Sequence, residues 1–141
     1  MLASVAEFCL NVNLRQRFEE EELNVELIES LLEKAQWVGV SLDAASLEME
    51  IRRRTEKIAE RLALEPAQLS RLVELDGAVD LVRFLPFEVN LRQVQNICHE
   101  ILRSTFPKVE EEARQGDKSA LAWVDRFTSV CDKLGLRVDE T

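Results

Sequence analysis

The sequence predicts an all-α fold: a single compact helical bundle of about five to seven helices joined by short loops. Only four glycines, three prolines and no tyrosine occur among 141 residues, so the turn residues on which sandwiches and barrels depend are scarce. Hydrophobic residues make up 46% of the chain and charged residues 32%, the balance of a folded globular protein. Because this length fits one domain with a buried core, we expect residues 1–141 to form a single all-α domain.

The first segment of the chain fits two conformations. Apolar residues at positions 8, 10, 12 and 14 alternate as they would in a strand, whereas those at positions 5, 8, 9 and 12 fit one face of a helix. Periodicity does not decide between these alternatives over so short a segment, and the conformation of residues 1–23 stays open.

Two strong helical patterns follow. The first runs from Val25 to Val38, with Asn24 placed to cap it and Gly39 to end it. The second runs from about Ala44 to Leu64. Their apolar residues recur at helical spacing; they are Val25, Ile28, Leu31, Leu32, Ala35 and Val38 in the first, and Leu47, Ile51, Ile58 and Leu62 in the second.

Three more helices and a short acidic segment complete the prediction. Pro66 suits the first turn of a helix that runs towards Pro86, and a further apolar stripe over residues 94–102 ends near Pro107. The acidic segment covers residues 109–115. Asp117 is placed to cap the last helix and Gly135 to end it.

The five-residue sequence VNLRQ occurs twice, at residues 12–16 and 89–93. In each copy an asparagine is followed three residues later by glutamine, the spacing of a capping box at the start of a helix. The copies belong to a wider pattern, apolar-any-apolar-Asx, which ends at Asn13, Asp43, Asn90 and Asp139. The sequence thus predicts helix starts at Asn13 and Asn90.

The charge and the cysteine content of the chain indicate which partners and which cellular compartment to expect. The net charge of −9 disfavours nucleic acid, and we interpret Arg52–Arg54 as a solvated helix face. We expect no membrane partner, because no run of about 18 apolar residues occurs, and the N-terminus lacks the basic region of a signal peptide. Three cysteines without a CxxC pattern suit buried free thiols, and a cytoplasmic location is expected.

No catalytic residue, metal ligand or cofactor-binding residue is predicted. Cys98 and His99 are adjacent on a predicted helix, so their side chains point about 100° apart and do not form a nucleophile–base pair. The acidic clusters fit exposed helix faces, and no glycine-rich loop is present to hold phosphate. Trp37 and Trp123 fit core or domain-interface packing, with stacking on a sugar ring as the alternative.

The segment LPFEVNLRQVQNICHEIL, residues 85–102, resembles the C-terminal helical region of large bacterial proteins related to glycoside hydrolase family 57, the α-amylase and α-mannosidase group. Residues 11–43 and 123–139 are similar to the same region in the same order. The resemblance implies a helical domain that packs on a catalytic barrel domain of the same or a companion chain. It also implies a role at the carbohydrate cleft for Asn90, Gln95 and Asn96.

These observations lead to one function hypothesis and two alternatives. The first is a non-catalytic accessory domain, the C-terminal helical part of a larger enzyme, that shapes or stabilises a carbohydrate cleft. The second is a free-standing helical module for protein interaction or dimerisation, which includes a homodimer. The third is a small autonomous enzyme.

Overall fold

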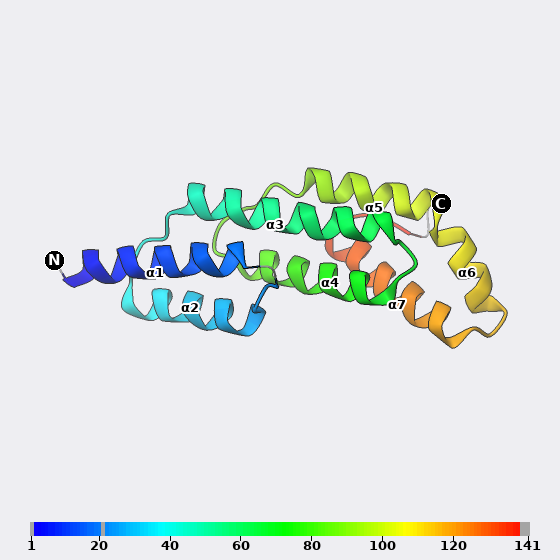
Figure 1. The fold of residues 1–141 in the computed structure, drawn as a ribbon, viewed down its shortest axis with the longest axis horizontal. Helices are drawn as coiled ribbons and strands as arrows, with labels where there is room; N and C mark the ends of the chain where they lie inside the picture. Colours follow the sequence, from blue (N-terminus) through cyan, green and yellow to red (C-terminus); the bar gives the residue numbers. More distant parts are fainter. Residues whose placement is uncertain (1, 21, 139–141) are drawn as a thin grey trace. The chain divides into compact units, whose positions relative to one another are not determined.

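The computed structural model describes residues 2–20 and 22–138, with side chains from residue 5 onward. This part of the chain folds into α-helices and contains no strand, so the all-α prediction is confirmed (Figure 1). The helices are α1 (Leu2–Glu19), α2 (Val25–Val38), α3 (Ala44–Leu64), α4 (Leu69–Phe84), α5 (Arg92–Ser104), α6 (Phe106–Arg114) and α7 (Lys118–Lys133).

The chain divides into two compact units. Unit 1 comprises Met1–Arg54 and Leu81–Asn90, and unit 2 comprises Thr55–Asp80 and Leu91–Thr141. Helices α3 and α4 therefore each contribute residues to both units. The expectation of a single domain over residues 1–141 stays a prediction.

Unit 1 is built on the pairing of α1 with α2, which lie side by side (Figure 1). Leu10, Leu14 and Phe18 recur every four residues along α1 and are buried, as are Ile28 and Leu32 of α2. The strand alternative for the N-terminal segment is thus wrong. The helical alternative is confirmed, but the buried face is not the expected one, because the position of α2 decides which side of α1 is covered.

Three residues on the expected apolar face of α1 point to solvent instead. Val5, Phe8 and Cys9 are exposed. The interpretation of all three cysteines as buried thiols is therefore wrong for Cys9, whereas Cys98 and Cys131 are buried. Burial raises the pKa of both of these thiols to about 12, and for Cys98 the neighbouring Cys131 adds to the shift.

The predicted ends of α2 are confirmed. The side chain of Asn24 accepts a hydrogen bond from the Leu27 N–H at 3.1 Å. Gly39 has a φ of 75°, the left-handed conformation in which glycine closes a helix, and its N–H donates to the Ala35 carbonyl. The predicted range of α3 is confirmed as well.

Arg54 closes the C-terminal end of α1. Its Nε donates to the Phe18 carbonyl at 3.1 Å and its Nη2 donates to the Glu19 carbonyl. These carbonyls lie in the last turn of α1, where the helix offers them no internal donor and a cation is favoured. The interpretation of Arg52–Arg54 as a purely solvated face is therefore wrong for Arg54.

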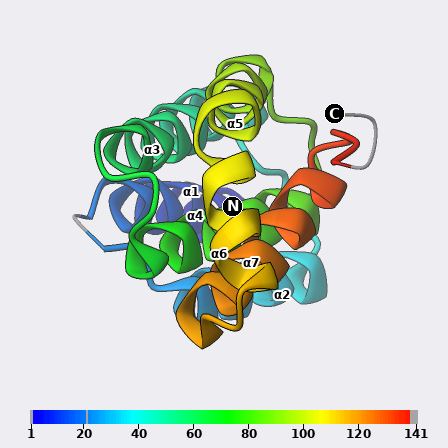
Figure 2. The same cartoon turned by 90° about the vertical axis from the view of Figure 1, so that its right-hand side faces the viewer.

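Unit 2 contains an aromatic core between α6 and α7, which lie side by side (Figure 2). Trp123 and Phe127 are stacked with ring centroids 4.8 Å apart, and Phe106 lies 5.9 Å from Phe127. The Trp123 Nε1–H donates to the Pro66 carbonyl at 2.8 Å, which satisfies the polar atom of a buried ring. Pro66 lies in the turn before α4 rather than in its first turn, so that part of the prediction is wrong.

The repeated sequence VNLRQ does not mark two helix starts. Its first copy lies inside α1, and α5 begins at Arg92 with Leu91, not Asn90, in the capping position. Asp117 does cap α7, since its side chain accepts from the Ala120 N–H at 3.1 Å. Helix α5 ends at Ser104, close to Pro107 as predicted, and Pro107 itself lies in the first turn of α6. The copy of the wider pattern at Asp139 lies outside the described residues.

Candidate functional site

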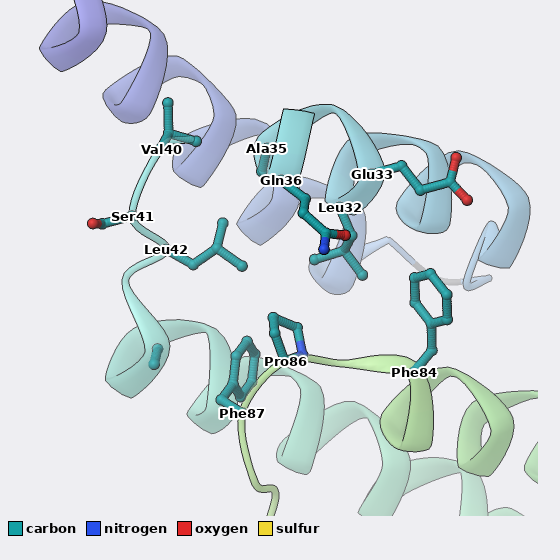
Figure 3. A pocket seen from close by; sticks show the side chains of 11 residues that line it. Leu32, Glu33, Ala35, Gln36, Val40, Ser41, Leu42, Phe84, Pro86 and Phe87 are labelled. Carbon is teal, nitrogen blue, oxygen red and sulfur yellow. The ribbon is translucent and has the colours of Figure 1, made fainter. Parts of the chain in front are cut away.

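An apolar groove opens on the surface of unit 1 (Figure 3). Its volume is about 660 Å³, within the range of sites that bind ligands or partner side chains. It lies between α2, the loop after it, the start of α3 and the chain that follows α4. The lining residues are Leu32, Glu33, Ala35, Gln36, Val40, Ser41, Leu42, Ala44, Phe84, Pro86 and Phe87.

Two apolar surfaces face each other across this groove. The rings of Phe84, Pro86 and Phe87 point towards α2, from which Leu32 and Gln36 point back towards them (Figure 3). The Phe84 side chain is 46% exposed, although it is one of the largest apolar groups in unit 1. An exposed phenylalanine beside an apolar hollow is the kind of surface at which proteins bind partners.

Asn11 holds the loop that forms one wall of the groove. From the middle of α1, its Nδ2 donates to the Ser41 carbonyl at 3.0 Å, and its Oδ1 accepts from the Asp43 N–H. The same amide also donates to the Glu7 carbonyl at 2.8 Å. Ser41 and the neighbouring Leu42 line the groove, so Asn11 fixes this wall from outside.

Glu48 holds the opposite wall. Its Oε2 accepts from the Asn90 N–H at 2.9 Å, and its Oε1 accepts from the Arg52 Nε at 3.2 Å. The Asn90 backbone ends the segment that carries Pro86 and Phe87. Both walls are therefore held by side-chain-to-backbone bonds, which reduces the ordering needed when a partner binds.

Replacing Asn11 with alanine is expected to lower the free energy of unfolding by about 1–2 kcal/mol, because two loop backbone groups lose their partner. Asn13→Ala is the matched control, since Asn13 lies on the same helix and its side chain does not bond to this loop. Urea denaturation measures both variants. Equal losses for the two would show that the effect comes from the helix and not from the loop.

A second, shallower hollow lies beside the groove on α2. It is lined by Glu33, Gln36 and Trp37, and the first two residues also line the groove. Trp37 is 90% exposed. Core packing within this chain, one of the three predicted roles for Trp37, is therefore wrong, and its indole ring is open to a partner.

The other predicted site residues do not line the groove. Trp123 is only 2% exposed, which confirms its predicted core packing and leaves no face for a sugar ring. Gln95 donates from Nε2 to the Leu134 carbonyl at 2.8 Å, so its amide ties α5 to the end of α7. Asn96 is exposed, and Asn90 contributes its backbone N–H to Glu48.

The sequence contained one usable signal for the groove. Asparagine has poor helix propensity, so Asn11 within a helix suggests that its side chain has another task. That signal depends on knowing that residues 2–19 are helical, which periodicity did not decide. Nothing in the sequence marked Glu48 as part of the groove wall, because glutamate is common on exposed helix surfaces.

A cluster of charged side chains around a buried carboxylate lies in unit 2, between α4 and α7. Asp76 is buried and accepts from Lys133 Nζ at 2.7 Å and from Arg126 Nη1 at 2.8 Å, and Lys133 also contacts Asp80 at 2.7 Å. Burial by itself raises the pKa of Asp76, but the bonds from Lys133 and Arg126 outweigh it and hold the pKa below its ordinary value. The charged side chains of this cluster pair with one another within unit 2.

Among the described residues, no group of three histidine, cysteine, aspartate or glutamate side chains is placed to hold a metal ion. Within the same residues, no helix has the length and apolar character needed to cross a membrane.

Comparisons with known proteins found no relative of this chain. No family model matches the chain, and neither the curated proteins nor the solved structures show a significant similarity to it.

Proposed function

We propose that this chain is a helical protein-interaction module that binds one α-helical segment of a partner protein in the groove of unit 1. The observation that carries the proposal is the open apolar lining, in which Phe84, Pro86 and Phe87 face α2 across an unfilled space of about 660 Å³. Such a space accommodates several apolar side chains from one face of a helix, the common form of helix-in-groove recognition.

A helix suits this lining better than an extended peptide. A bound helix satisfies its own backbone hydrogen bonds and presents only side chains to an apolar wall. An extended peptide needs an exposed strand edge to pair with, and in the described part of unit 1 the groove is formed by helices and loops.

Charge favours a different protein over a second copy as the occupant. The chain carries a net charge of −9, and Glu33 stands at the edge of the groove. A second copy would bring the same charges to the same place and repel, whereas a partner with basic residues would be attracted.

The proposal is tested with a displayed library of 15-residue amphipathic helical peptides, selected on the full chain. Ala44→Trp fills the groove from an exposed position at its edge and is expected to weaken the selected peptides at least tenfold. Ala45→Trp is the matched control: this residue is also exposed and does not line the groove, so affinities should stay within about twofold.

Three results would contradict the proposal. The first is the selection of peptides whose dissociation constants are the same for both variants, which would place binding elsewhere. The second is the absence of selected peptides. The third is a dimer in sedimentation that Ala44→Trp dissociates, which would make a second copy the occupant. Circular dichroism of each variant checks that the helices are retained.

A second function is favoured by the resemblance of residues 85–102 to the C-terminal helical region of family 57-like glycoside hydrolases. In that case the partner is a catalytic barrel domain of the same or a companion chain, and the bound helix belongs to it. A barrel domain in the same chain requires a much longer native polypeptide, whose size an immunoblot of source cells measures. A band from a polypeptide much longer than 141 residues favours the accessory domain. A band from a polypeptide of about that length opposes a barrel domain in the same chain.

A further inference from the structure

The hollow beside the groove combines a carboxylate with an uncovered indole. Glu33 and Trp37 are four residues apart on α2, so their side chains lie on the same face of the helix. Gln36 also lines the hollow, and both Glu33 and Gln36 line the groove, so the hollow adjoins the groove along these two residues. A helix that is docked in the groove and extends over Glu33 would reach the hollow that Trp37 lines.

The charge around this hollow is predominantly negative. Glu26, Glu29 and Glu33 recur at spacings of three and four along α2 and lead towards Trp37. The basic residue Lys34 points about 100° away from Glu33, but it lies three residues before Trp37 and so on the side of α2 that carries the indole. Within the described residues, no ion pair involves Glu33.

We propose that Glu33 and Trp37 form a subsite for a single cationic side chain, arginine or lysine, carried by the helix that docks in the groove. This inference rests on the proposed function and adds the chemistry of the partner, a basic amphipathic helix. A cation over an indole face gains cation–π attraction, and the carboxylate beside it supplies an ion pair. Arginine fits best, because its planar guanidinium stacks on the ring while its N–H groups bond the carboxylate.

The combination of the two groups discriminates against other occupants of Trp37. A sugar ring stacks on an indole but brings no positive charge for Glu33. An apolar side chain covers the indole but leaves the carboxylate beside an apolar surface without a partner, which weakens binding. Only a cation with an apolar or planar body satisfies both groups.

The test uses the same displayed library with arginine, lysine, glutamine and leucine allowed at each position that flanks the apolar face. We expect one flanking position to be enriched in arginine or lysine. A peptide with arginine there and its glutamine counterpart are then titrated into the full chain. The change in Trp37 emission reports binding, and Trp37→Leu, in which Trp123 alone emits, gives the background.

Matched variants separate the subsite from the general negative charge. Glu33→Gln is expected to weaken the arginine peptide about tenfold and leave the glutamine peptide unchanged. Glu26→Gln removes the same unit of charge from an exposed position two turns away on α2, and it should change the affinity of either peptide less than about twofold. Trp37→Leu, measured by calorimetry, should reduce the preference for arginine by a similar factor to Glu33→Gln.

The outcomes distinguish this inference from the proposed function. Peptides that are sensitive to Ala44→Trp but show no preference for arginine or lysine would overturn the cation subsite and leave groove binding intact. An arginine preference that Glu26→Gln and Glu33→Gln reduce equally would also overturn it, since the effect would then be diffuse attraction. If no peptide is sensitive to Ala44→Trp, both proposals fail.

Discussion

Replacing Asp76 with asparagine is expected to lower the free energy of unfolding by about 3 kcal/mol. The Asp76 carboxylate is buried, with a side chain only 7% exposed, and it bonds both Arg126 and Lys133 from α7. Asparagine keeps the shape but removes one of the two carboxylates that compensate the partly buried Lys133, which is then paired with Asp80 alone, and it also removes the partner of Arg126. Breaking a buried ion pair on one side is costlier than the loss of a surface pair.

The same substitution should change how stability depends on pH. Because the folded pKa of Asp76 lies below its ordinary value of 3.8, the unfolded chain takes up the proton first as pH falls. The contribution of Asp76 is therefore complete above about pH 5 and is lost as pH falls through the folded pKa. For Lys133, burial lowers the pKa but the bonds to Asp76 and Asp80 raise it above 10.5, so its contribution persists until pH exceeds that value.

Urea denaturation of the wild type and variants between pH 2.5 and 8 measures this contribution. Asp80→Asn is the matched control, because Asp80 contacts the same Lys133 from an exposed position and should cost less than about 1 kcal/mol. We expect the loss of stability on acidification to be smaller in Asp76→Asn than in the wild type. If Asp76→Asn and Asp80→Asn cost the same, or if Asp76→Asn loses as much stability on acidification as the wild type does, the buried cluster does not stabilise unit 2 in this way.

Replacing Phe127 with alanine is expected to lower the free energy of unfolding by about 4 kcal/mol. Phe127 is fully buried in unit 2, stacked on Trp123 and in contact with the ring of Phe106. Alanine removes the ring from a close-packed site and leaves a cavity that rigid helices fill only in part. The loss of unfolding free energy is the sum of the lost burial of the ring and the cost of the cavity.

Leu121→Ala is the matched control on the same helix, because Leu121 is half exposed and should change stability by less than about 1 kcal/mol. Chemical denaturation measures both variants. In Phe127→Ala we also expect the emission of Trp123 to shift to longer wavelength, since its ring loses the partner that covers it. A cost below about 1.5 kcal/mol, without this shift, would show that the aromatic stack is not part of the core.

Local chemistry was sufficient to predict several elements. Asn24 and Gly39 bracket α2 as expected, and Asp117 caps α7, because caps act within three or four residues of the chain. The range of α3 was also predicted, since Leu47, Ile51, Ile58 and Leu62 repeat over many turns and all are buried. Such patterns need no knowledge of distant residues.

The failures share a physical cause. VNLRQ has the composition of a helix start in both copies, yet its first copy continues inside α1, because burial of Leu10, Leu14 and Phe18 against α2 outweighs a cap worth about 1 kcal/mol. Trp37 and Trp123 each lie near a helical apolar stripe, and the neighbours in space decide that one is exposed and the other buried. A single sequence pattern contains no record of those neighbours.

The sequence by itself determined that the protein is helical, where α2 begins and ends, the range of α3, the cap of α7 and the net negative charge, because propensity, capping and charge are local properties. The tertiary structure alone decided where the groove lies. Its walls come from α2 and from residues 84–87, which are more than 45 positions apart. They are held by Asn11 and Glu48, whose partners Ser41, Asp43 and Asn90 lie 30 to 42 residues away. Contacts over such separations form only when the packed helices bring them together, and they give the protein its candidate binding surface.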